Sequence, residues 1–381
     1  MTRKTSRIPL TVMSPGTARA ITVHRYGTAG ARPKAYFQAG IHADEIPGML
    51  TLHHLTRLLD EADARGDIVG EIIVVPFANP IGLNQRYEGD LLGRYEFRGG
   101  GNFNRGYPRL DEAMGDAVEG KLGADAEANV ALIRAAFLAE VAALTPRNEI
   151  EAQRKTLMGL AGDADLVFDV HCDSEAVLHL FIGTHLWPEM ADLSAQMASQ
   201  ATMLEIDSGD GSFDEAFSRP WWTLAQRFGD EFPIPFACLS STVELRGTAD
   251  VSDKLNATDA DNLFRYLQRR GVVAGDPGPL PEALCEATPL AGIEYYSAPH
   301  AGIVNYLFEP GDQVRAGDTV CEIIDPNADD PTTARTPLVS TIDGVLVGRH
   351  LIKFAVPGER VCRVSGTEPL DNPEDWSKLE D

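Results

Sequence analysis

The sequence predicts an α/β domain with a mixed or mostly parallel sheet, followed by a small all-β module. Residues 20–260 alternate short apolar, β-branched stretches with longer helical patterns, which is typical of α/β domains. Residues 271–283 (GVVAGDPGPLPEA) are rich in glycine and proline and indicate a linker. After this linker the pattern predicts only short strands. We therefore expect two domains, at residues 1–275 and 284–372.

The elements of the first domain follow from the spacing of the apolar residues. Strands are predicted at 20–27, 34–42, 70–80, 164–174, 177–185 and 235–247. Helices are predicted at 45–66, 124–144, 188–201 and 258–271. Residues 87–108 are rich in glycine and arginine and show neither period, so we expect a long functional loop there.

Composition excludes several classes of partner. Acidic residues outnumber basic residues by 57 to 33, giving a formal charge of −24, so the chain as a whole repels nucleic acid and anionic lipid. Five scattered cysteines without CxxC spacing argue against a disulfide framework or a zinc knuckle. No stretch has the apolar length of a signal peptide core or a bilayer span. We expect a cytoplasmic protein with neither nucleic acid nor membrane as partner.

The C-terminal module resembles the biotinyl/lipoyl hammerhead fold in its glycine-aspartate turns and in the opening APHAGIV, residues 298–304. Carrier activity in that fold requires a lysine in an exposed hairpin. The corresponding stretch, residues 325–339 (DPNADDPTTARTPLV), contains none. We therefore expect a structural or gating module.

A candidate metal site lies where the strand predicted at 34–42 meets the following helix. His42 and Glu45 are three residues apart at this junction, and His171 ends the later buried stretch LVFDVH. Three His, Asp or Glu ligands with one open position are typical of catalytic zinc, and ligand crevices of open α/β sheets lie at strand ends. HxxE alone is weak evidence. The alternative is a turn histidine bonded to the backbone, with Glu45 stabilising the helix N-terminus.

Other polar residues are candidates for substrate contact. Asn104 and Arg105 lie side by side in the long loop, and Arg105 could pair with a substrate carboxylate. Arg98 could polarise a carbonyl, whereas Arg94 is interpreted as a solubilising loop residue. Glu244 interrupts the stretch STVELRG and could act as a general base. Its alternative is an edge glutamate facing solvent and paired with Arg246.

Taken together, the motifs resemble the succinylglutamate desuccinylase/aspartoacylase family of zinc enzymes. The matching motifs are G-x-H-x-x-E at 40–45, N-x-N-R at 102–105, D-x-H at 169–171 and T-x-E at 242–244. The resemblance covers residues 35–275, and the β module also resembles the family's C-terminal domain. It implies a carboxypeptidase-A-like mixed sheet flanked by helices, and makes residues 1–275 a zinc-dependent hydrolase domain.

The resemblance also implies residue roles. One Zn²⁺ per chain would be held by His42, Glu45 and His171. The substrate carboxylate would be bound by Asn104 and Arg105, with Glu244 as the general base. Arg98 falls near the family's carbonyl-polarising arginine, and Asp169 could orient His171.

The sequence also departs from the family pattern. Asn-Phe-Asn-Arg replaces the usual Asp-Leu-Asn-Arg, Ala43 replaces a common glycine, and no arginine lies shortly upstream of Glu244. Substrate identity therefore does not follow from the resemblance.

We therefore expect an amidohydrolase acting on carbon–nitrogen bonds other than peptide bonds, with a small N-acyl amino acid-like molecule as substrate. One alternative is a metallocarboxypeptidase acting on short peptides. An alternative of another class is a non-catalytic, metal-free binding module. Whether the chain forms a homo-oligomer stays open.

Overall fold

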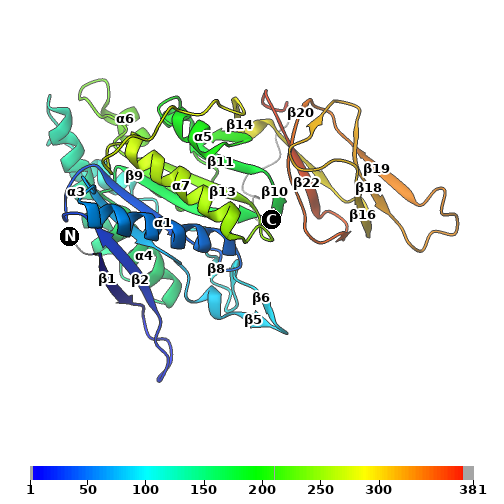
Figure 1. Cartoon of the computed structure of the whole chain (residues 1–381), viewed down its shortest axis with the longest axis horizontal. Helices are drawn as coiled ribbons and strands as arrows, with labels where there is room; N and C mark the ends of the chain where they lie inside the picture. The colour runs from blue at the N-terminus through cyan, green and yellow to red at the C-terminus, as the bar shows by residue number, and fades with distance from the viewer. Residues whose placement is uncertain (1–2, 210, 372–381) are drawn as a thin grey trace.

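A large mixed sheet with helices on both faces forms the body of the protein (Figure 1). The computed structural model describes residues 3–209 and 211–371. In spatial order the sheet contains β1 (Lys4–Pro9), β2 (Ala20–Tyr26), β4 (Glu71–Val75), β3 (Lys34–Ala39), β9 (Leu166–Asp173), β13 (Leu239–Gly247), β11 (Leu178–Gly183), β12 (Ala201–Glu205) and β14 (Ala287–Pro289). Strands β4, β3, β9 and β13 are parallel neighbours, so their carboxyl ends meet at one edge.

The helices bury two separate apolar cores against this sheet. One core involves α1 (Ile46–Arg65), α5 (Ala191–Met197) and α7 (Asp253–Arg269). The other involves α2 (Asp111–Val118), α3 (Ala126–Ala143), α4 (Glu149–Ala161) and α6 (Glu215–Phe228). In α1 the buried Leu52, Leu55 and Leu59 recur at helical spacing, which explains why this segment packs as an amphipathic helix.

The structure confirms the predicted mixed α/β architecture and corrects some elements. The helix predicted at 188–201 ends at Met197, because Ala198 adopts a left-handed conformation with φ of 55°, and Ala201 already begins β12. Helices α2, α4 and α6 escaped prediction; α6 contains Pro220, a residue that normally interrupts helices. The loop at 87–108 carries two small hairpins, β5/β6 (Arg86–Tyr87, Asp90–Leu91) and β7/β8 (Tyr95–Glu96, Gly101–Asn102).

The segment after the linker folds into short strands around its own apolar core. The strands are β15 (Ile293–Ser297), β16 (Gly302–Tyr306), β17 (Gln313–Val314), β18 (Thr319–Ile324), β19 (Arg335–Val339), β20 (Gly344–Arg349), β21 (Phe354–Ala355) and β22 (Arg360–Gly366). Strand pairing crosses the linker in both directions, because β14 joins β12 of the large sheet while β10 (Glu175–Ala176) joins β20. The division at 275/284 and the biotinyl/lipoyl likeness stay predictions.

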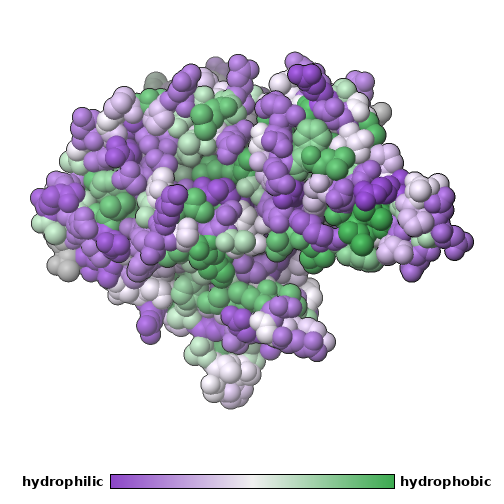
Figure 2. Space-filling view, turned by 45° about the vertical axis from the view of Figure 1, so that its right-hand side comes forward, coloured by the Kyte–Doolittle hydropathy of each residue, from purple (hydrophilic) through white to green (hydrophobic). Residues whose placement is uncertain are grey.

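The remaining elements are single 3₁₀ turns, η1 (Gly82–Asn84), η2 (Thr184–Leu186) and η3 (Leu290–Gly292). The surface in Figure 2 is mostly polar, with apolar patches on the side that carries the C-terminal strands. Exposed apolar residues on those strands include Ile303 and Phe354, which pair between β16 and β21. Among the described residues, no helix combines the length and apolar character needed to cross a membrane.

Candidate metal centre and active site

The turn between β3 and α1 presents two side chains of the candidate metal site. Gly40 has a φ of 66°, a left-handed conformation that lets the chain leave β3 sharply. Glu45 stands at the N-cap of α1, yet its side chain makes no capping hydrogen bond. Its Oε1 instead lies 2.8 Å from Nδ1 of His42. The carboxylate therefore faces the histidine, which weakens the alternative of a helix-capping glutamate beside a backbone-bonded histidine.

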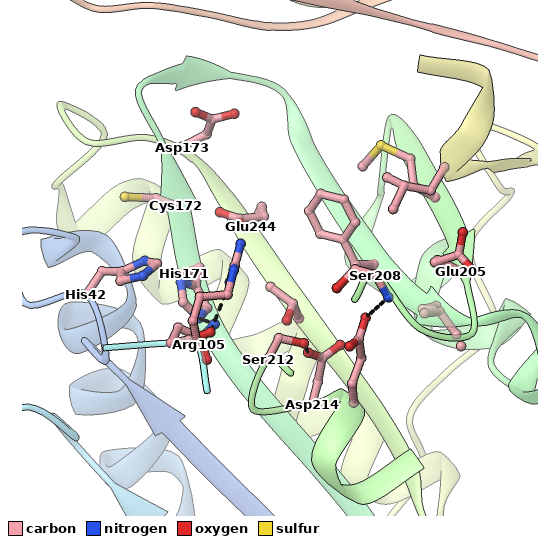
Figure 3. A pocket seen from close by; sticks show the side chains of 18 of the residues that line it. His42, Arg105, His171, Cys172, Asp173, Glu205, Ser208, Ser212, Asp214 and Glu244 are labelled. Atoms are coloured by element: carbon pink, nitrogen blue, oxygen red, sulfur yellow. Dashed lines mark hydrogen bonds between the residues drawn. The ribbon is translucent and has the colours of Figure 1, made fainter. Parts of the chain in front are cut away.

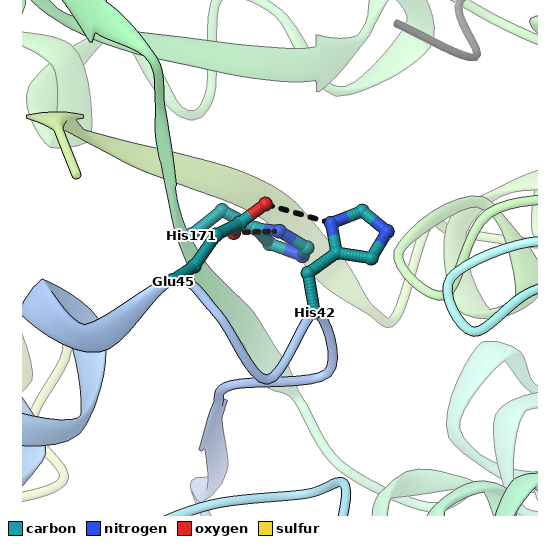
Figure 4. Close-up of side chains that lie close together, drawn as sticks. All are labelled: His42, Glu45 and His171. Carbon is teal, nitrogen blue, oxygen red and sulfur yellow. Dashed lines mark hydrogen bonds and ion pairs between the residues drawn. The ribbon is translucent and has the colours of Figure 1, made fainter. Parts of the chain in front are cut away.

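His171 completes this cluster from the neighbouring strand β9. Its Nδ1 lies 2.8 Å from Oε2 of Glu45, which also accepts a hydrogen bond from the backbone N–H of Cys172 (Figure 4). All three side chains are buried, and their potential ligand atoms lie within 4.8 Å of one another. The three residues that the sequence suggested as metal ligands are therefore brought together.

The outer nitrogen of each imidazole is held by a polar partner. Nε2 of His42 lies 2.8 Å from Oδ1 of Asn102. Nε2 of His171 lies 3.2 Å from Nδ2 of Asn104 and forms an ion pair of 2.9 Å with Oδ2 of the fully buried Asp169, whose Oδ1 accepts a hydrogen bond from Gln38. Both Nδ1 atoms thus face the Glu45 carboxylate and are the nitrogens available to a metal ion. Such partners fix ring orientation in metal sites.

Burial and mutual charge set the ionisation of the cluster. Burial, with the nearby Arg94 cation, lowers the pKa of His42 to about 4, so this imidazole is neutral at physiological pH. Burial also opposes the charge of His171, but the Asp169 and Glu45 carboxylates outweigh it and raise its pKa well above the usual value. The two histidines hold the pKa of Glu45 well below its usual range despite burial. In the absence of metal, a proton on His171 balances this carboxylate.

A pocket with about 990 Å³ of free space, including its mouth, opens beside the cluster (Figure 3). Glu244 enters it from β13, where it stands in register with His171. Oε2 of Glu244 is buried and has no hydrogen-bond partner in the described part of the chain. Burial, followed by the charges of Glu45 and Asp173, raises the pKa of Glu244 to about 8. The group therefore has the proton affinity expected of a general base at a reaction centre.

The alternative interpretation of Glu244, a pairing with Arg246, has no counterpart among the contacts of the described residues. Arg246 forms a two-pronged ion pair with Asp259 of α7 instead. Residues two apart on a regular strand point to the same face. Arg246 has a φ of 62°, so the strand is irregular here and the two side chains diverge. The Glu244 carboxylate is therefore directed to the pocket.

The loop residues Asn104 and Arg105 both line the pocket. Oδ1 of Asn104 accepts a hydrogen bond of 3.0 Å from the backbone N–H of Phe213, which fixes the amide. Nη1 of Arg105 donates to the Asn104 carbonyl at 2.9 Å. This arrangement is compatible with the substrate-binding roles suggested by the sequence.

The arginine at the metal cluster differs from the one expected. Arg98 is exposed and lies outside the residues that line the pocket, whereas Nη2 of Arg94 lies 3.1 Å from Oε1 of Glu45. Gly93 makes this approach feasible, because a Cβ there would stand 2.5 Å from the backbone nitrogen of Asp44. The loop lacks a regular period, so the sequence did not show which arginine turns inward.

A further pocket arginine, Arg363, comes from β22 beyond the linker. Its Nη2 donates to Oδ2 of Asp173 and lies 3.2 Å from Nε2 of His179. Nδ1 of His179 bonds to a backbone carbonyl, and burial lowers the pKa of His179 to about 4, so its Nε2 is free to accept. Sequence reasoning missed Arg363 and Asp173, because no motif links them, and interpreted His179 only as a structural or surface residue beside a strand.

Comparisons with known proteins agree with this geometry. Residues 31–141 match the succinylglutamate desuccinylase/aspartoacylase catalytic domain. A solved protein of that family from Shewanella amazonensis superimposes with a TM-score of 0.83 at 25% identity, covering 96% of this chain and 98% of that one. A second, from Shewanella frigidimarina, gives 0.84 at 23% identity, with 96% and 98% covered.

A more distant structure shares the fold alone. The product-bound ectoine utilization protein EutE (DoeB) of Ruegeria pomeroyi gives a TM-score of 0.67 at 18% identity, with 95% of this chain and 94% of that chain covered. No functionally curated protein matches the chain in sequence.

Proposed function

We propose that the protein is a zinc-dependent amidohydrolase acting on N-acyl amino acids; residues 31–141 match the model of the succinylglutamate desuccinylase/aspartoacylase catalytic domain, which supports this proposal. The observation that carries the proposal is the buried His42, Glu45 and His171 cluster, which opens directly on a pocket containing Glu244.

The donor set supports zinc as the ion. Two imidazole nitrogens and one carboxylate match the ligands of catalytic zinc sites, which leave one position open. Nδ1 of His42, Nδ1 of His171 and the Glu45 carboxylate would hold the ion. A bound Zn²⁺ supplies a Lewis acid that polarises the scissile carbonyl and acidifies water.

The side chains around the cluster account for the remaining steps. Glu244 accepts a proton from the attacking water and delivers it to the departing nitrogen. The pKa of Glu244 stands at about 8, and it would fall beside a bound divalent cation, which would favour the ionised form that accepts a proton. Arg105 and Asn104 hold the substrate carboxylate in register. Arg94 takes the place expected of Arg98, with its guanidinium at the cluster.

The shape of the pocket favours a small substrate over a peptide. Leu290, Tyr295 and Arg363, all from the segment after the linker, contribute to its wall. A polypeptide would have to pass this wall to place its C-terminal peptide bond at the cluster. This supports the deacylase over the metallocarboxypeptidase. The intact set of ligand-type residues likewise speaks against a non-catalytic binding module.

Two variants and a substrate panel test the proposal. The zinc-loaded protein is expected to hydrolyse N-acetyl or N-succinyl amino acids and to leave di- and tripeptides intact. His171→Ala should lose both zinc and turnover, whereas Glu244→Gln should keep one zinc per chain and lose turnover. A His171→Ala protein that stays active and zinc-loaded, or peptide cleavage faster than deacylation, would overturn the assignment.

A further inference from the structure

The sheet formed by β19, β18, β16 and β21 turns one of its two faces to solvent. Alternate residues of a strand point to opposite sides of a sheet. One side of this sheet packs on the apolar core of the C-terminal strands, through residues such as Val304 and Ile323. On the other side, Ile303 of β16 stands opposite Ile324 of β18 and Phe354 of β21. We call this side the outer face; its apolar residues are Ile303, Ile324, Pro337, Val339 and Phe354.

The outer face is apolar at positions where an antiparallel sheet beside solvent normally carries polar side chains. Ile303 is 43% exposed and Phe354 is 50% exposed. The polar residues of this face bond to one another, because Glu322 accepts hydrogen bonds from Asn305 at 3.2 Å and from Arg335 at 2.6 Å. The charges of Glu322 and Arg335 therefore cancel on the outer face, although the chain as a whole carries a formal charge of −24.

Residues 351–356 (LIKFAV), which we call the edge segment, extend the apolar surface to the end of the sheet. Their strand β21 pairs with β16 on one side, and no strand within the described residues pairs with its other side. Leu351, Ile352 and Val356 are all exposed, by 47% to 61%. Figure 2 shows apolar side chains gathered on the side of the molecule that carries the C-terminal strands. Exposed edge strands of soluble proteins are normally protected by charged residues, proline or a covering element.

The one charged residue of the edge segment points toward the protein. Nζ of Lys353 lies 2.6 Å from Oε2 of Glu175 and 4.8 Å from the centre of the Tyr306 ring. Ala355, two residues later, is likewise buried. The edge segment therefore alternates as a strand does, but with its apolar side chains in solvent and its charge turned inward. This arrangement is expected of a surface that a partner covers.

The size of the exposed surface fits a protein partner. Ile303, Leu351, Ile352, Phe354 and Val356 are each about half exposed, which leaves on the order of 400 Å² of apolar surface. Standard interfaces bury about 800 Å² per partner, of which somewhat more than half is apolar. The exposed apolar surface thus matches what one partner of a stable dimer contributes.

We propose that the outer face and the edge segment form a two-fold interface with a second copy of this chain. In a two-fold dimer the same surface serves both partners, and antiparallel pairing of the edge segment with its counterpart occupies the open edge of β21. The internally paired Glu322 and Arg335 favour a second copy over a charged partner, because they offer no net charge for such a partner to recognise. The interface does not depend on the proposed function.

The mass of the protein in solution tests this interface. Sedimentation of the wild type at about 10 μM should give twice the chain mass of 41.3 kDa. Phe354→Asp and Val356→Asp should each raise the dissociation constant of the dimer by about thirtyfold or more, because each places a carboxylate in an apolar contact beside its own copy. Val12→Asp changes a valine of similar exposure, 59%, outside this surface and is the matched control.

Circular dichroism establishes that each variant is folded. A wild type that stays monomeric up to about 100 μM would overturn the proposal, and would assign the surface to residues 372–381 of the same chain or to a different protein. Dissociation of Val12→Asp to the same extent as Val356→Asp would overturn it as well.

Disulfide trapping tests the position of the interface. Ile352→Cys and Phe354→Cys bring the introduced thiol close to its copy across the two-fold axis. Cys285 is half-buried and the other four cysteines of the chain are buried, so the background is low. Incubation with oxidised glutathione should yield a reducible band of twice the chain mass for at least one of these variants and none for Val12→Cys. A dimeric protein that neither variant crosslinks would place the interface elsewhere and refute the proposal.

Discussion

Replacing Asp169 with asparagine should weaken zinc binding by an amount that depends on pH. Asp169 is fully buried, and its Oδ2 lies 2.9 Å from Nε2 of His171. Replacing the carboxylate partner of a metal-ligating histidine typically weakens metal binding about 10- to 100-fold. Asp169→Asn should therefore reduce zinc affinity by about this factor once His171 is deprotonated, which corresponds to about 1.4–2.8 kcal/mol.

Proton competition sets the sign of the pH dependence. Asp169 and Glu45 raise the pKa of His171, so zinc must displace a proton from this residue at neutral pH. Affinity of the wild type should therefore rise with pH, by up to about tenfold per unit. In Asp169→Asn the pKa of His171 falls, so the zinc affinity of the variant stops rising at a lower pH than that of the wild type. The difference in zinc affinity between the two proteins should be largest at high pH and should become smaller as pH falls.

The assay is competition for Zn²⁺ against a chromogenic chelator between pH 6 and 9. Asp230→Asn, an exposed aspartate outside the pocket, is the matched control. Thermal unfolding of the metal-free proteins checks that the variant is folded. The role of Asp169 would be refuted if the zinc affinity of Asp169→Asn stayed within twofold of the wild type across this pH range. A difference in zinc affinity that grows toward low pH would refute it as well.

Three further predictions concern other residues. Arg94→Ala should lower kcat/KM about tenfold or more in steady-state assays, whereas Arg98→Ala should stay within about twofold; the reverse result would restore the sequence-based assignment. Arg246→Ala leaves the buried Asp259 carboxylate without its cation and should destabilise the fold by about 3 kcal/mol in denaturant unfolding; an unchanged midpoint would contradict this. Glu215 ionises near pH 7 when folded and near pH 4 when unfolded, so its contribution to the free energy of unfolding is fully present below pH 4 and lost by pH 7. Glu215→Gln should make the free energy of unfolding depend less steeply on pH between pH 4 and 7. An equally steep dependence would argue against the raised pKa.

The sequence predicted the parts of the site that follow from regular structure. His42, Glu45 and His171 stand at the ends of neighbouring parallel strands, where the apolar stretches before them and the family resemblance together had suggested a site. The role of Glu244 was suggested by the resemblance, and only the structure shows that β13 lies beside β9.

The features that the sequence did not show depend on contacts made by irregular segments, in which apolar residues follow neither the helical nor the strand period. Arg94 and Arg98 lie in an irregular loop, where packing of Gly93 against the 42–45 turn decides which arginine points inward. The acidic residues of the pocket wall escaped notice because neither β12 nor α6 was predicted, and the helix predicted at 188–201 reached only the first residue of β12. Glu205 and Glu215 are positioned by these two elements.

The ion pair between Arg363 and Asp173 joins the segment after the linker to the strand that carries His171. The candidate metal ligands His42, Glu45 and His171 all precede Asp173, whereas Arg363 is 190 residues later in the chain. A chain released at the linker would contain every candidate metal ligand but would lack one wall of the pocket. The proposed metal site and the proposed substrate pocket therefore depend on different parts of the chain: the first on the β3–α1 turn and β9, the second also on β22.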